Sequence, residues 1–104
     1  MSARREKLEK MLAAAPDDSL LRYMLAMELD RENQPAQSLE QFEHLMQQAT
    51  PYVPAFLMSG QLLMRIGQTE KARSVFVAGI AAAQAAGNAH AAGEMAGFLS
   101  SLGN

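Results

Sequence analysis

The amino-acid sequence predicts an all-α protein of about six helices that pair as antiparallel helix-turn-helix units. Apolar residues recur three and four positions apart, as in Leu8, Met11 and Leu12. Val and Ile together number only five and no period-two alternation persists, which argues against a sheet. Residues that break or turn helices interrupt the chain about every 15 to 18 residues, at Pro16, 33–35, Thr50-Pro51, Gly67 and Gly87-Asn88.

The helices are expected, in order, over 3–15, 18–32, 36–49, 53–66, 70–86 and 89–102. Asp17 or Asp18 can cap the second helix, because a carboxylate accepts hydrogen bonds from the unpaired N–H groups of a first turn. Pro54 suits the first turn of the fourth helix, where its missing N–H costs nothing. Gly87-Asn88 comes two residues later than the repetition described below predicts, so the fifth helix should be extended.

Length and composition bound the class of protein. A chain of 104 residues with 49% hydrophobic residues is expected to form one domain with its own core. A net charge of -2 gives no general attraction to nucleic acid or to anionic lipid. The absence of cysteine excludes disulfides and thiolate metal sites. The apolar run 11–15 is too short for a signal peptide, and no run could span a membrane, so a soluble, cytoplasmic protein is expected.

The sequence repeats itself with a period of 34 residues. The aligned pairs include Met24/Met58, Leu29/Leu63, Arg31/Arg65, Phe42/Phe76, Ala26/Gly60, Ser38/Ala72 and the turn pair Asn33/Gly67. A period of 34 with a helix-turn-helix inside it is the length of one known repeat class.

These positions resemble the tetratricopeptide repeat family, as found in small bacterial proteins. The markers of the second repeat are Phe56, Gly60, Leu63, Gly67, Ala72 and Phe76, and those of the first are Leu25, Ala26, Leu29, Ser38, Phe42 and Leu45. Arg22, Asn33 and the late Pro51 depart from the family pattern.

The resemblance implies a single domain, 1–104, folded as a short right-handed superhelical solenoid of stacked hairpins. Residues 3–15 would form the second half of a preceding repeat, followed by repeats 19–52 and 53–86. The helix 89–102 would cap the stack through the apolar stripe Ala92, Met95, Leu99 and Leu102.

Small residues are expected where two helices cross closely, since packed helix axes lie only about 8–10 Å apart. Gly60 with Ala72, and Ala26 with Ser38, would be these crossings. Gly67 would end its helix in the left-handed conformation, which Asn can also adopt at position 33.

The resemblance further implies a concave groove that binds a peptide or helix of a partner protein. Carried over by position, its lining is Leu20, Tyr23, Met27, Asp30, Arg31, Pro54, Leu57, Gln61, Met64 and Arg65. Tyr23 and Met27 replace the Lys and Asn with which some relatives hold a C-terminal carboxylate. An amphipathic helix or an extended apolar segment is therefore the expected ligand, which methionines can accommodate. Alternatively, Met27 and Met64 simply pack against neighbouring helices, and Arg31 and Arg65 offset helix dipoles instead of binding a partner's acidic groups.

The last helix leaves a second possibility open. Gly93 and Gly97 share a face with Ala89, which either allows close approach of another helix or weakens the helix. A homodimer could therefore form through this glycine face or through the groove. Chemistry has little support: His90 and Glu94 are only two potential metal ligands, and Glu40 and Glu43 beside His44 suggest a solvated face. A non-catalytic protein without cofactor or metal, and without a nucleic-acid or membrane partner, is expected.

Overall fold

The computed structural model describes residues 2–103, and this part of the chain forms six α-helices and no strand. Their bounds are α1 Ala3–Ala14, α2 Ser19–Arg31, α3 Pro35–Met46, α4 Val53–Arg65, α5 Thr69–Ala85 and α6 Ala89–Ser101. The predicted all-α class is confirmed. The Asp18 carboxylate accepts from the Leu21 N–H and caps α2, as expected.

The second helices of the two hairpins, α3 and α5, differ in length. Helix α3 ends at Met46, three residues before the predicted end, because the chain turns over 47–52 and the Tyr52 N–H bonds back to the Leu45 carbonyl at 3.1 Å. Helix α5 has 17 residues against 12 in α3, so the expected extension is present.

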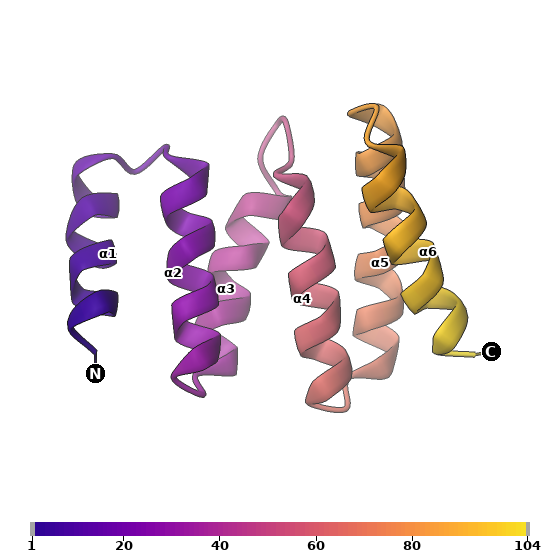
Figure 1. Ribbon diagram of the computed structural model, residues 1–104, viewed down its shortest axis with the longest axis horizontal. Coiled ribbons are helices and arrows are strands. Elements are labelled where there is room, and N and C mark those ends of the chain that lie inside the picture. Colours follow the sequence, from indigo (N-terminus) through magenta and orange to yellow (C-terminus); the bar gives the residue numbers. More distant parts are fainter. Residues whose placement is uncertain (1, 104) are drawn as a thin grey trace.

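The helices stand side by side as a row of antiparallel hairpins (Figure 1). Helices α2 and α3 form one hairpin and α4 and α5 the next, while α1 packs on α2 and α6 packs on α5. Helices α2, α4 and α6 lie in front in Figure 1, and α3 and α5 lie behind them. The molecule measures 41 × 29 × 18 Å, and a thickness of 18 Å corresponds to about two helix diameters.

The apolar core runs along the row as three groups of buried residues. The first, between α1 and α2, holds Leu8, Leu12, Leu25 and Leu29. The second, between α2, α3 and α4, holds Ala26, Phe42, Leu45, Ala55 and Leu62. The third joins α4, α5 and α6 and includes Phe56, Leu63, Phe76, Ala83, Ala92 and Met95, with Leu99 and Leu102 packed against it. The apolar stripe of α6 therefore covers the end of the core, as predicted.

The turns within the two hairpins share one backbone geometry. Asn33 and Gly67 have positive φ angles of 61° and 81°, so both adopt the predicted left-handed conformation. The next N–H in each turn, from Gln34 or Gln68, donates to the carbonyl five residues earlier at 2.9 and 2.8 Å. This pattern pairs carbonyls that the helix end would leave unsatisfied.

The two predicted helix crossings are built differently. The Ser38 hydroxyl donates to the Ala26 carbonyl at 2.7 Å, which confirms the first contact. At Gly60, the group that an added Cβ would meet is the ring of Phe76, one turn beyond Ala72. The space that Gly60 leaves at this crossing is therefore filled by the Phe76 ring, and Ala72 is fully buried one turn earlier on the same helix.

A further close approach, not indicated by the repeat pattern, occurs at Gly79. A Cβ there would lie 2.5 Å from the Met95 Sδ and 2.6 Å from the Phe56 Cβ, so α5 is held tightly against both neighbours. Gly93 and Gly97, in contrast, have no heavy atom within 4 Å of an added Cβ. Nothing within residues 2–103 packs closely on those two glycines.

Polar contacts attach α1 to α2. The Arg5 Nε lies 2.9 Å from the Glu32 Oε1, and the Arg4 Nε lies 3.3 Å from the Glu28 Oε1. The Ser2 hydroxyl, which also caps α1, donates to the Glu32 carboxylate. These bonds lower the pKa of Glu32, chiefly through the Ser2 hydroxyl and then through Arg5.

Candidate functional site

The predicted groove residues come from α2 and α4, which lie on the front of the row in Figure 1. We call this surface the inner face, defined by Leu20, Tyr23, Met27, Asp30, Arg31, Leu57, Gln61, Met64 and Arg65. Helix α2 presents its members at intervals of three and four residues, which keeps them on one stripe. Pro54, also expected there, is exposed in the first turn of α4.

The aromatic and apolar members of the inner face are anchored in the core. The Tyr23 ring is half-buried, with its centroid 6.1 Å from that of Phe42 and 5.4 Å from that of Tyr52. Burial, and secondarily the nearby Tyr52, raises the pKa of the Tyr23 hydroxyl. Met27 packs on the same group of core residues, and Met64 packs on the third group, while both keep part of their surface in solvent. These side chains therefore both pack internally and contribute apolar surface.

Leu20 differs from its neighbours on the inner face. Its side chain is 55% exposed, although Leu is usually found inside. It precedes Tyr23 by less than one turn of α2, so the exposed apolar surface continues into the half-buried row.

Charged members of the inner face pair with each other across the two repeats. The Arg65 guanidinium approaches both Asp30 carboxylate oxygens, with Nη2–Oδ2 at 2.6 Å and Nη1–Oδ1 at 3.4 Å. This two-point contact joins α2 to α4 and was not anticipated from the sequence. Arg31 is mostly exposed and lies 3.9 Å from the Glu28 carboxylate one turn earlier.

The inner face contains two shallow hollows. One, of about 220 Å³, is lined by Arg4, Tyr23, Met24, Met27, Glu28 and Arg31. The other, of about 260 Å³, is lined by Gln61, Met64, Arg65 and Phe98. Three predicted residues line each hollow, whereas Leu20, Asp30 and Leu57 line neither. Phe98 of α6, stacked on Phe76 with ring centroids 5.6 Å apart, lines the second hollow and was not predicted.

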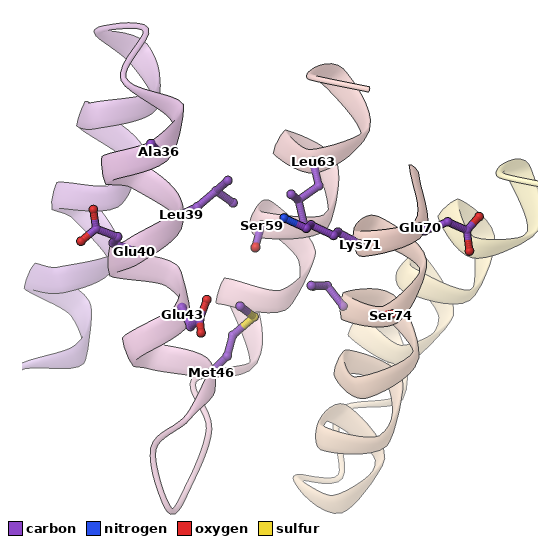
Figure 2. Close-up of a pocket in the computed structure, with 11 residues that line it drawn as sticks. Ala36, Leu39, Glu40, Glu43, Met46, Ser59, Leu63, Glu70, Lys71 and Ser74 are labelled. Atoms are coloured by element: carbon purple, nitrogen blue, oxygen red, sulfur yellow. The ribbon is translucent and has the colours of Figure 1, made fainter. Parts of the chain in front are cut away.

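A larger pocket, of about 580 Å³, opens on the opposite side of the row, between α3 and α5 (Figure 2). We call it the outer pocket. Its lining is Ala36, Leu39, Glu40, Glu43, Met46, Ser59, Leu63, Glu70, Lys71, Ser74 and Val75. Sequence reasoning placed Glu40 and Glu43 on a solvated face and missed the pocket, because periodicity does not show how far apart α3 and α5 stand.

The candidate metal pair remains at the surface. The His90 Nε2 lies 3.4 Å from the Glu94 Oε1, and the His90 side chain is 88% exposed. Across residues 2–103, no three His, Cys, Asp or Glu side chains are grouped so that they could hold a metal ion. Over the same residues, no helix combines the length and apolar character needed to cross a membrane.

Two solved structures are similar to this chain over most of its length. One is a tetratricopeptide repeat domain protein from Salinibacter ruber, with 26% sequence identity over 85% of this chain and 89% of that chain and a TM-score of 0.79. The other is protein BPP2914 from Bordetella parapertussis, with 31% identity over 98% of this chain and 89% of that chain and a TM-score of 0.80. No family model matches the chain, and no curated protein does.

Proposed function

The chain belongs to the tetratricopeptide repeat family, and from this premise we propose that it is a non-catalytic protein-interaction scaffold. In this proposal the inner face holds a peptide or an amphipathic helix of a partner protein. Recognition would depend on apolar side chains of the partner that pack against the exposed Leu20 and enter the two hollows.

The observation that carries the proposal is the row of apolar side chains left partly open on α2 and α4. Leu20 is exposed, and Tyr23, Met27 and Met64 each keep part of their surface in solvent. Methionine adapts to irregular partners because its side chain is unbranched and flexible. The packing of Tyr23 on Phe42 and Tyr52 fixes the Tyr23 ring before binding, which reduces the entropy that this side chain loses on association.

The Asp30–Arg65 pair would divide the ligand's contacts between the two hollows. The Asp30 carboxylate and the Arg65 guanidinium are already paired with each other, so a charged group of the partner would have to compete with this ion pair. The proposal therefore expects affinity to come from apolar contacts on either side of the pair.

The test uses two exposed apolar residues on opposite sides of the molecule. Leu20 on α2 and Val77 on α5 are each 55% exposed, so Leu20→Glu and Val77→Glu change charge equally and remove similar apolar surface. Wild type and both variants serve as bait in affinity capture from the native cells, with quantitative mass spectrometry. A partner retained by wild type and Val77→Glu but lost by Leu20→Glu is expected. Equal capture by all three proteins would refute the assignment to the inner face.

Self-association through α6 is the second candidate function. It is favoured by the open space over Gly93 and Gly97, where a helix of a second copy could approach closely. Light scattering at micromolar concentration tests it, with Gly97→Glu as the disrupting variant. A monomeric mass for the wild type would remove this candidate.

A further inference from the structure

The outer pocket has the size and composition of a binding site. Its volume of about 580 Å³ falls within the roughly 300–1,000 Å³ typical of ligand sites. Leu39, Met46, Leu63 and Val75 make much of its lining apolar, and Ser59 of α4 lies between them. The pocket therefore has an apolar interior, and the charged residues at its lining come from α3 and α5.

The equivalent interval between α1 and α3 is filled differently, as the 34-residue register shows. Ser59 occupies the position of Leu25 in that interval, so a side chain is shortened where the pocket opens. Leu39 occupies the position of Arg5, whose guanidinium is engaged with Glu32 at 2.9 Å. The lining of the outer pocket thus differs in residue type from the equivalent positions between α1 and α3.

The charges around the outer pocket are mainly negative. Glu40 and Glu43 come from α3, and Glu70 and Lys71 come from α5. Glu70 is largely exposed and lies 3.5 Å from Arg73, so part of its charge is balanced. Figure 2 shows the Lys71 side chain reaching across the pocket toward α4. Glu40 and Glu43 have no ion-pair partner within residues 2–103, so the excess negative charge lies on the α3 side of the pocket and favours a positively charged group there.

We propose that the outer pocket docks a basic amphipathic helix of a partner protein, with large apolar side chains inside the pocket and Lys or Arg beside Glu40 and Glu43. These two carboxylates are three residues apart on α3, so they can meet basic residues on successive turns of one helix. The pocket opens to solvent between two helices, which gives a further helix room to lie along them. This site is separate from the inner face and does not depend on the function proposed there.

Two fluorescently labelled synthetic peptides are the probes. Both are amphipathic helices of equal length with the same leucines, and their polar positions are all Lys in one and all Glu in the other. Fluorescence anisotropy against the full chain should give saturable binding of the Leu/Lys peptide and at least about tenfold weaker binding of the Leu/Glu peptide, because like charges repel. Equal affinity for the two peptides would overturn the proposal.

Variants locate the bound peptide. Glu40→Gln with Glu43→Gln should weaken Leu/Lys binding about tenfold, since two exposed ion pairs are lost. The control, Glu6→Gln with Glu9→Gln, makes the same charge change at the equivalent positions of α1 and should leave binding unchanged. Similar losses in both double variants would show general attraction to negative charge and would overturn the site.

A third variant fills the outer pocket without changing its charge. Ser74 is exposed at the pocket's edge, so Ser74→Trp places a large ring there while circular dichroism checks that the fold persists. Binding of the Leu/Lys peptide should be lost. Full binding by Ser74→Trp, or loss in Leu20→Glu instead, would place the peptide elsewhere and refute the proposal.

Discussion

Replacing two helix-interior glycines by alanine separates packing from helix propensity. Gly60 lies within α4 and Gly93 within α6. Alanine is favoured over glycine in a helix interior by about 1 kcal/mol at either position. The surroundings differ, because Gly60 faces the Phe76 ring and an added Cβ at Gly93 meets open space.

At Gly60 the added methyl group would overlap the Phe76 ring. Three ring atoms lie closer than ordinary contact, and the most distant of them, Cδ1, is 2.8 Å from the Cβ position. The ring is fully buried and stacked on Phe98, so it cannot swing into solvent. Overpacking of this kind costs about 1–3 kcal/mol. Gly60→Ala should therefore be neutral to about 2 kcal/mol less stable, and Gly93→Ala about 1 kcal/mol more stable.

Urea unfolding followed by circular dichroism measures the free energy of unfolding of both variants and the wild type. The difference between the two variants, about 1–3 kcal/mol, is the decisive quantity because the propensity gain cancels in it. A domain of this size should show it as a separation of melting temperatures of about 4–8 °C for each kcal/mol. Equal stabilities of Gly60→Ala and Gly93→Ala would refute the packing argument.

Three further predictions concern the ends of the stack and one turn. The pKa of Glu32 is lowered in the folded state, so the Glu32 carboxylate should stabilise the fold above the unfolded pKa near 4.5 and lose this effect as pH falls through the folded pKa. The urea midpoints of wild type and Glu32→Gln should therefore converge in that acidic range. A difference in midpoint that does not change with pH would contradict the prediction. Asn33→Ala should cost about 1 kcal/mol, because alanine tolerates the left-handed conformation at φ 61° poorly; thermal melting against the helix-surface control Gln37→Ala checks this. Met95→Ala should lower the free energy of unfolding by about 2–5 kcal/mol, because Met95 is fully buried between α6 and the core. Amide hydrogen exchange should show that protection is lost mainly in α6. A uniform loss of protection along the chain would contradict local detachment of α6.

The helices and their order could be predicted because their signals are local. Asp18, Asn33 and Gly67 act on the backbone within a few residues of themselves, so their roles follow from residue type and position. The 34-residue period adds long-range information, since equivalent residues of stacked repeats must meet equivalent surroundings. The assignment of the inner face to α2 and α4 came from the family resemblance carried over by that register, and it stays a prediction.

Side-chain partners and empty space depended on the tertiary structure. Gly60 was expected at a close helix crossing with Ala72, and only the structure shows that the Phe76 ring fills the space beside Gly60. Arg65 pairs with Asp30 across two repeats, a choice made by the distance between α2 and α4. Gly79 looked unremarkable in the sequence and proved to be held between Phe56 and Met95.

By itself, the sequence of this protein determined the all-α class, the succession of hairpins, the left-handed turns at Asn33 and Gly67, and the cap formed by α6. Only the tertiary structure decided that the inner face is divided into two hollows and that a larger pocket opens between α3 and α5. The physical reason is that helix formation and capping are set by neighbours in the chain, whereas a pocket is the space left between helices. That space depends on the volumes and rotamers of side chains from several elements at once.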